Sequence, residues 1–210
     1  MLFRSEDEYS FKLASQDIID VLDDAGIEKA HFVGVSLGTI IIRTIGEMQP
    51  ERVQSLVMCG AIMRLNIRSR FLVSLGHMFK KVVPFMWLYK LFAWIILPRK
   101  RHSESRNLFI REAKKLYKKE FIKWFNMTHE VNPLLRYFRE RELRIPTLYV
   151  MGSEDYLFLP PVKQIVKDHT KSVLEVVSQC GHVVNVEQPE VFNRVSLNFL
   201  KADGQPYSLR

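Results

Sequence analysis

The sequence is poor in the residues that hold secreted or metal-binding domains together. It contains two cysteines among 210 residues, Cys59 and Cys180, and neither has the spacing of a metal site. We therefore expect no disulfide framework and no bound metal, and we interpret both thiols as inert packing residues in a reducing compartment. The first ten residues lack the apolar stretch of a secretory signal, so the expected location is the cytoplasm.

Repeats and low-complexity tracts are also absent, and a composition that is 47% hydrophobic can supply one good core. The net charge of +8 is unevenly distributed. Of the 31 Lys and Arg residues, 20 lie between Ala61 and Ile145, together with only 6 of the 23 Asp and Glu residues. This pattern predicts a basic insertion in an acidic framework, and it argues against a nucleic-acid partner.

No apolar run is long enough for a typical transmembrane helix of about 20 residues. The strongest candidate, residues 82–98, contains Pro84 and Lys90. Two interpretations remain open for this segment. We favour a hydrophobic helix that caps a pocket, but basic flanks and several aromatic residues also suit peripheral contact with a membrane or lipid. A basic amphipathic helix is predicted over residues 107–125.

Helical and strand patterns alternate along the rest of the chain. Helices are predicted over residues 10–25, 39–48, 160–168 and 189–200, and strands over residues 31–33, 53–59, 147–151 and 172–177. A long helical region, residues 61–144, separates the second strand from the third. The alternation predicts an α/β fold with a mostly parallel sheet and right-handed crossovers.

The segment Gly34-Val35-Ser36-Leu37-Gly38 joins a predicted strand to a predicted helix. A serine on such a tight turn has strained backbone dihedral angles, and we expect the two glycines to prevent Cβ clashes. The turn would expose the Ser36 hydroxyl and direct the Leu37 N–H, at a helix N-terminus, toward a developing oxyanion. Taken alone, the five residues also fit a Gly-rich turn without chemistry.

Two further residues of catalytic type follow the ends of predicted strands. Asp155 lies three residues after Gly152, and His182 follows Gly181 in the loop after the last strand. Because the carboxyl ends of parallel strands lie at one edge of a sheet, we expect Ser36, Asp155 and His182 to meet there. Turn or capping roles are the alternative interpretation for the aspartate, and a solvent-exposed loop residue is the alternative for the histidine.

Three segments in this order, GVSLG (34–38), MGSED (151–155) and CGHVVNVEQPEVFN (180–193), resemble the α/β-hydrolase superfamily. The resemblance is to its small, helically capped esterase-like members and extends over about residues 3–200. It implies an α/β-hydrolase-type sheet, of which this chain holds the C-terminal half. The core would consist of residues 1–60 and 145–210, and residues 61–144 would form a helical cap insertion.

The resemblance also implies roles for individual residues. Ser36 would be the nucleophile, His182 the general base and then acid, and Asp155 its orienting carboxylate. Glu154 is an alternative acid, but the spacing of Asp155 from the preceding glycine matches the family better. The Leu37 N–H would be one oxyanion donor, and no cofactor is implied.

The implied activity is hydrolysis of a carboxylic ester, with a small-molecule ester or acyl compound as substrate. A carbon–carbon bond hydrolase, an acyl transferase and a non-catalytic ligand- or partner-binding relative would share the same residues. The chain departs from the family because only about 30 residues precede the Ser36 strand, whereas members have about four strands there and a second oxyanion donor. We therefore expect weak activity, and an unpaired apolar strand edge prone to aggregation or dimerisation.

Overall fold

A four-stranded parallel sheet forms the centre of the molecule. The computed structural model describes residues 9–65, 74, 78, 83–115, 122–124 and 126–202. The strands are adjacent in chain order and comprise β1 (Ala30–Val35), β2 (Val53–Cys59), β3 (Thr147–Gly152) and β4 (Ser172–Val177). The predicted α/β fold with a mostly parallel sheet is confirmed.

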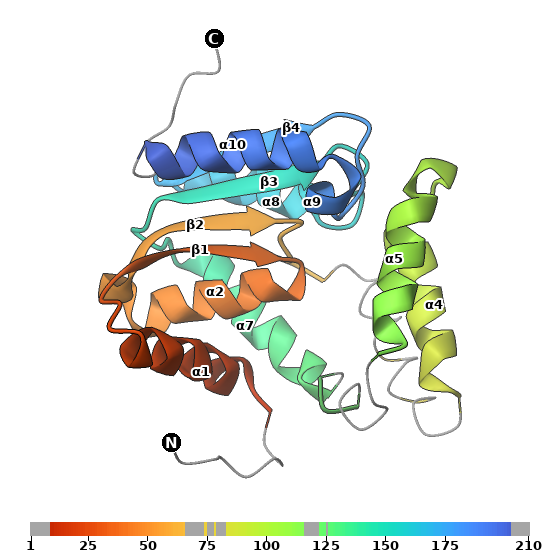
Figure 1. The fold of residues 1–210 in the computed structure, drawn as a ribbon, viewed down its shortest axis with the longest axis horizontal. Coiled ribbons are helices and arrows are strands. Elements are labelled where there is room, and N and C mark those ends of the chain that lie inside the picture. Colours follow the sequence, from red (N-terminus) through yellow and green to blue (C-terminus); the bar gives the residue numbers. More distant parts are fainter. Residues whose placement is uncertain are drawn as a thin grey trace.

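Helices cover both faces of this sheet (Figure 1). Alternate side chains of β2 and β3 point to opposite faces, and both strands are buried. One face packs against α10 (Pro189–Lys201) and the short α9 (Val184–Glu187), which the sequence analysis did not predict. The other face packs against a larger set of helices, namely α1 (Phe11–Asp24), α2 (Leu37–Met48), α7 (Thr128–Glu140) and α8 (Leu159–Asp168).

The helix before β1, α1, is capped at both ends. The Ser10 hydroxyl oxygen accepts a hydrogen bond from the Leu13 N–H at 3.1 Å, which satisfies one free amide of the first turn. Gly26, with φ of +66°, ends the helix in the left-handed conformation that glycine adopts without strain. These caps fix the direction in which the chain enters β1.

A pair of helices, α4 (Phe85–Ile96) and α5 (Ser103–Ala113), lies beyond the carboxyl ends of the strands (Figure 1). A 3-10 turn, η2 (Lys100–His102), connects them, and a second one, η1 (Pro50–Arg52), precedes β2. In the part of the chain that the structure describes, no helix is both long and apolar enough to cross a bilayer.

The helix predicted over residues 107–125 is wrong in its extent. It begins at Ser103, and Ala113 is followed by a turn at residues 114–115. The Lys115 N–H donates to the Glu112 carbonyl at 3.0 Å, a hydrogen bond over three residues that forms a tight turn in place of the α-helical pattern. Most of the predicted remainder, residues 116–121 and 125, lies outside the described residues.

The boundaries of the predicted insertion, residues 61 and 144, stay a prediction. Within that range, α7 packs against the same core as α2, through buried Val131, Leu135 and Phe138. By contrast, α4 buries Leu88 in a separate small cluster. The region between β2 and β3 therefore contains helices in two different environments.

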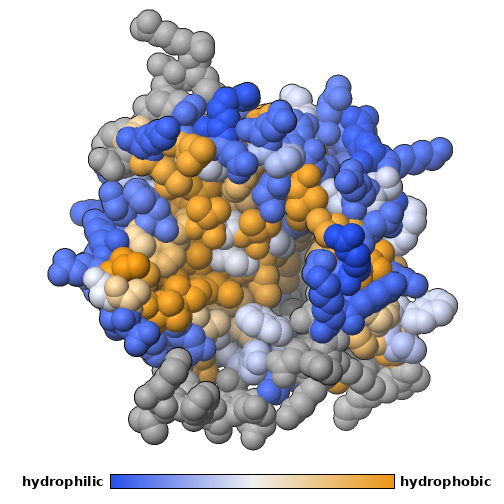
Figure 2. All heavy atoms as spheres, in the orientation of Figure 1, coloured by the Kyte–Doolittle hydropathy of each residue, from blue (hydrophilic) through white to orange (hydrophobic). Residues whose placement is uncertain are grey.

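β1 forms one edge of the sheet among the described residues, as the sequence predicted. The side chain of Val33 in β1 is 49% exposed, although helices cover the neighbouring strands. Figure 2 shows apolar side chains gathered across this side of the molecule, and a hollow between the sheet core and the α4–α5 pair.

Candidate active site

Ser36 occupies the turn between β1 and α2 with a backbone conformation that is rare for a serine. Its φ is +52° and its ψ is −115°. The Ser36 N–H donates to the Cys59 carbonyl at 2.9 Å, and the Thr39 hydroxyl donates to the Ser36 carbonyl at 2.6 Å. Such strained residues cost about 1–3 kcal/mol each and cluster at functional sites. The surrounding hydrogen bonds therefore hold a strained serine at the end of β1.

The two glycines of the motif differ in what they permit. A Cβ atom on Gly34 would lie 2.7 Å from the Gly38 carbonyl oxygen, so the close contact between β1 and α2 requires glycine at this position. A Cβ atom on Gly38 would meet nothing within 4 Å among the described residues. The expectation that both glycines prevent a clash is therefore wrong for Gly38, which lies on the open side of the first turn of α2.

The structure brings together the three side chains that the sequence placed at this edge. The His182 Nε2 lies 2.8 Å from the Ser36 Oγ, and the His182 Nδ1 lies 2.7 Å from the Asp155 Oδ2. His182 is 3% exposed and Asp155 is 2% exposed. The other carboxylate oxygen of Asp155 accepts from the Phe158 N–H at 3.2 Å, which fixes the carboxylate plane.

Two glycines make room for the histidine loop, namely Gly152, which the sequence analysis used only to locate Asp155, and Gly60, which it did not single out. A Cβ atom on Gly60 would lie 2.3 Å from the His182 carbonyl oxygen, and one on Gly152 would lie 1.9 Å from the Gly181 carbonyl oxygen. Gly60 also has φ of +55°. Gly60 follows β2, and Gly152 ends β3. A glycine at the end of a strand was therefore the sequence signal that could have identified both positions. The loop with His182 therefore packs directly on the ends of β2 and β3.

Glu154, the alternative acid, points to different partners. Its carboxylate contacts the segment between α4 and α5, with Oε1 lying 3.2 Å from Arg99 Nη1 and 3.4 Å from Arg101 Nη1. Its Oε2 lies 2.9 Å from His102 Nε2. Below, the word cap denotes only α4, η2 and α5, residues 85–113, and not the whole predicted insertion. The carboxylate hydrogen-bonded to His182 is thus that of Asp155, and Glu154 attaches the cap to the loop after β3.

His102 was missed by the sequence analysis, and its surroundings show why it matters. The side chain is fully buried, and its Nε2 also lies 3.7 Å from Glu187 Oε2. The same Glu187 oxygen accepts from the Gly181 N–H at 2.8 Å. One histidine of the cap therefore lies between two carboxylates, each attached to a loop that carries Asp155 or His182.

The backbone amide of Leu37 and the two buried thiols, Cys59 and Cys180, complete the groups described around the site. Leu37 is the first residue of α2, so its N–H lies at the positive end of the helix dipole. Burial raises the pKa of the Cys59 thiol to about 11 and that of Cys180 to about 12, which keeps both protonated at neutral pH. Within the described ranges, no cluster of three or more His, Cys, Asp or Glu could hold a metal ion.

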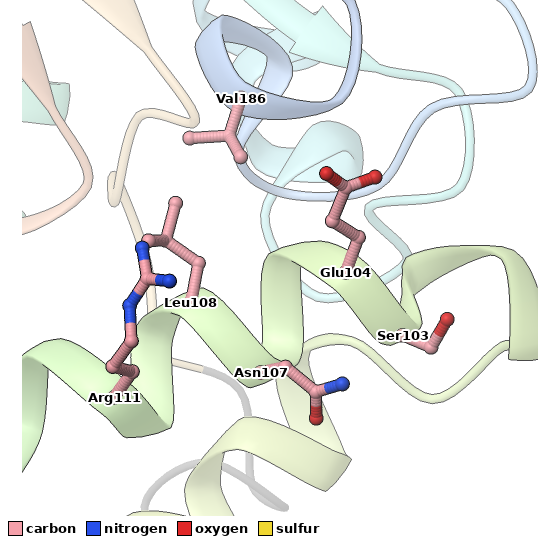
Figure 3. Close-up of a pocket in the computed structure, with 6 residues that line it drawn as sticks. All are labelled: Ser103, Glu104, Asn107, Leu108, Arg111 and Val186. Carbon is pink, nitrogen blue, oxygen red and sulfur yellow. The ribbon is translucent and has the colours of Figure 1, made fainter.

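A cavity of about 440 Å³ lies between the cap helix α5 and Val186 of α9 (Figure 3). Leu108 and Glu104 extend from α5 toward Val186, and Ser103, Asn107 and Arg111 complete the lining. Because α9 begins two residues after His182, this cavity adjoins the segment that carries the histidine. It combines apolar walls with groups that can bind polar parts of a ligand.

Comparison with known proteins identifies the family. The model of the alpha/beta hydrolase family matches residues 3–195. A 2-hydroxy-6-oxononadienedioate/2-hydroxy-6-oxononatrienedioate hydrolase of Comamonas testosteroni is 26% identical, with 92% of this chain and 70% of the relative covered. A protein of Bacillus subtilis (strain 168) named "Uncharacterized carboxylesterase nap" is 25% identical, with 89% and 61% covered.

Solved structures share the architecture. A thermophilic esterase superposes with a TM-score of 0.74 at 23% identity, with 95% of this chain and 76% of that chain covered. At this identity the likeness concerns the fold. The family match extends over nearly the whole chain and includes the Ser36 turn, Asp155 and His182. The chain therefore belongs to the alpha/beta hydrolase family.

Proposed function

We propose that this chain is a serine hydrolase that cleaves carboxylic esters through an acyl-enzyme on Ser36. The observation that carries the proposal is the continuous chain of hydrogen bonds from the Ser36 hydroxyl through His182 to Asp155. Nucleophile, base and orienting carboxylate within hydrogen-bond distance form the arrangement that activates a serine. The strained turn that presents the hydroxyl adds independent support.

The acylation step follows from this geometry. With its Nδ1–H donating to Asp155, His182 has an unprotonated Nε2 that accepts the Ser36 proton as the oxygen attacks the ester carbonyl carbon. The Leu37 N–H helps to stabilise the resulting oxyanion. The imidazolium then gives the proton to the leaving alcohol as the carbon–oxygen bond breaks, and the acyl group stays on Ser36.

Deacylation repeats these steps with water. His182 Nε2 takes a proton from the water molecule, the hydroxide adds to the acyl carbon, and the collapse of the tetrahedral intermediate releases a carboxylic acid. The proton returns from His182 to the Ser36 oxygen. Asp155 accepts the hydrogen bond from the imidazole and orients it for both proton transfers.

The proposed substrate is a small ester or acyl compound, and the cleavage uses no cofactor. The cavity between α5 and α9 has an apolar wall formed by Leu108 and Val186, which suits an acyl chain. Arg111 on the same lining supplies a positive charge for an anionic group. We keep the cytoplasm as the proposed location.

A second candidate, hydrolysis of a carbon–carbon bond, is favoured by one observation. The Comamonas testosteroni relative is named as a hydrolase of 2-hydroxy-6-oxononadienedioate. The same serine, histidine and aspartate could serve this reaction, so the two candidates differ in substrate and not in site. Turnover of p-nitrophenyl esters compared with that of a vinylogous 1,5-diketone would separate them.

The test is covalent labelling with a fluorophosphonate, which reacts with an activated serine. Wild-type protein should be labelled and Ser36→Ala should not. We expect Asp155→Ala to slow labelling by roughly 1,000-fold or more, because the histidine loses its orientation. Absence of labelling in folded wild-type protein would instead support a non-catalytic binding relative.

The chain offers a matched control. Ser55 Oγ lies 2.7 Å from His31 Nδ1, so a second serine–histidine pair exists in the same sheet. His31 lies near the amino end of β1, away from the edge where Ser36 lies. Ser55→Ala should therefore leave the labelling rate unchanged. If it removed labelling while Ser36→Ala did not, the assignment of the nucleophile would be wrong.

A further inference from the structure

The outer face of α4 carries an unbroken row of exposed apolar side chains. Three of them lie within the helix, with Trp87 71% exposed, Leu91 42% exposed and Trp94 54% exposed. Pro84 and Pro98 extend the row at the two ends and are exposed as well. The spacing of four and three residues places Trp87, Leu91 and Trp94 on one side of the helix, and the two prolines flank them just outside α4. We call this row the α4 outer stripe.

Among the described residues, the other sides of α4 pack in the Leu88 cluster and, at Ile95 and Ile96, against the main core. Leu88 and Ala93 are buried, and the Tyr89 and Phe109 rings lie 5.0 Å apart, which joins α4 to α5. In Figure 1, α4 lies on the far side of α5 from the strand ends. A helix that is apolar all round is normally buried or in contact with lipid. The stripe residues Trp87, Leu91 and Trp94 remain exposed, although Arg106 of α5 contacts one face of the Trp94 ring.

Contacts at the end of α4 fix the conformation of the stripe. The Arg106 guanidinium lies 3.7 Å from the centre of the Trp94 ring, and the same side chain donates to the Leu97 carbonyl at 2.6 Å. The Tyr156 hydroxyl donates to the Ile95 carbonyl. These contacts fix the end of α4 with Trp94 directed outward, so little conformational entropy is lost when the ring is covered.

Positive charge surrounds the stripe. Lys90 is exposed next to it within α4, and three consecutive cations, Arg99, Lys100 and Arg101, follow its end and are exposed. The sequence contains no Asp or Glu between Glu51 and Glu104. Arg99 and Arg101 contact the Glu154 carboxylate, but their side chains stay 57% and 47% exposed. A partner that covers this face must therefore offer an apolar region bordered by negative charge.

We propose that the α4 outer stripe docks onto the surface of an anionic lipid bilayer. Trp side chains favour the headgroup region, and Lys and Arg beside them bind lipid phosphates. At 1.5 Å per residue, the 12 residues of α4 span about 18 Å, less than the roughly 30 Å hydrocarbon core, so the helix lies in the plane of the interface. A second copy fits less well, because it would place two cationic surfaces against each other.

The two tryptophans of the stripe provide a direct readout. The chain has three tryptophans, and the third, Trp124, packs edge-on against Tyr9. Trp124→Phe would leave emission from Trp87 and Trp94 alone. Vesicles of phosphatidylcholine with phosphatidylserine should shift this emission to the blue, and brominated lipid should quench it. Phosphatidylcholine alone should give a weak effect, and high salt should reverse the binding.

Substitutions separate the stripe from other apolar surface. The double variant Trp87→Ser with Leu91→Ser should bind anionic vesicles at least about tenfold more weakly in co-sedimentation. A matched control, Val21→Ser with Leu197→Ser, changes side chains that are 62% and 52% exposed on α1 and α10, and it should bind like wild type. Lys90→Gln should weaken binding by about fivefold.

Several results would overturn the proposal. They are absence of vesicle binding by the folded protein, equal losses in the stripe variant and its control, and a blue shift without lipid that grows with protein concentration. The last result would identify a second copy as the occupant. Because none of these measurements uses catalysis, the docking surface and the proposed hydrolase function can fail separately. Circular dichroism of each variant would verify that it is folded.

Discussion

The helices α2 and α4 have the same length and opposite environments. Each has 12 residues, but α2 buries seven of them and α4 buries two, Leu88 and Ala93. α4 is nevertheless the more apolar helix, with Lys90 as its single charged residue. Burial thus follows from which neighbours a face meets and not from how many apolar residues the helix has.

Polar groups show the same contrast. Arg43 of α2 is 3% exposed, and burial lowers its pKa, but its guanidinium donates to the Arg141 carbonyl at 2.8 Å and lies 2.9 Å from the Glu47 carboxylate. These partners make a buried cation tolerable. Lys90 of α4 is exposed. The position of Ser36 therefore depends on α2, which is fixed by the core, while α4 remains available for contact.

The largest expected difference between the two regions is in thiol reactivity. Cys59 lies beside the start of α2, and its pKa of about 11, against an ordinary value of 9.0, lowers the thiolate fraction at neutral pH by about 100-fold. In the variant Leu91→Cys, the new thiol on α4 should react with Ellman's reagent at least 100 times faster than Cys59. Mass spectrometry of the modified peptides would show it, and equal rates would contradict the burial of Cys59.

Truncation of one apolar side chain in each helix should sharpen the comparison. Ile45→Ala in α2 removes a fully buried side chain and should lower the free energy of unfolding by about 2–5 kcal/mol. Leu91→Ala in α4 should change it by less than about 0.5 kcal/mol. Urea titration followed by circular dichroism measures both. A large loss for Leu91→Ala would mean that the α4 outer stripe is covered within the molecule.

The two glycines beside Ser36 provide a test within the α2 region. Gly34→Ala places a methyl group 2.7 Å from the Gly38 carbonyl oxygen and should lower the free energy of unfolding by about 1–3 kcal/mol. Gly38→Ala meets open space and should raise it by up to about 1 kcal/mol, because alanine favours the helix. Equal losses would show that the turn tolerates no Cβ atom on either side.

The smallest effect is expected at the attachment of the cap. His102→Gln removes the imidazole between Glu154 and Glu187, while Arg99 and Arg101 still contact Glu154. The free energy of opening the cap should fall by about 1 kcal/mol. This change would be measured as roughly fivefold faster hydrogen exchange in residues 103–113. His169→Gln, at a buried histidine far along the chain after α8, is the control. Unchanged exchange for His102→Gln would refute the attachment.

Much of the sheet could be predicted because its strands are read from local patterns. The strands 53–59 and 172–177 have the predicted limits, since short runs rich in apolar and β-branched residues, bounded by turns, allow few alternatives. The approach of Ser36, Asp155 and His182 followed from one rule, that parallel strands end at the same edge. The catalytic roles of these residues remain the proposal that labelling tests.

The contacts of the cap could not be predicted in the same way. His102 meets Glu154 across 52 residues of sequence, and no local pattern marks either residue as the partner of the other. The open space at Gly38 and the close contact at Gly60 likewise depend on segments that pack together only in the folded chain. Periodicity describes which face of an element is apolar, but it does not say which neighbour that face will meet.

The exposed guanidinium groups around Glu154 have a practical consequence for enzymology. Arg99 and Arg101 are 57% and 47% exposed, so dissolved ions screen their attraction to the carboxylate, whereas the buried His102 contact is screened far less. Raising the ionic strength would therefore loosen part of the cap attachment while Ser36, His182 and Asp155 keep their hydrogen bonds. Substrate preferences measured in different buffers would then report on the cap as well as on the substrates.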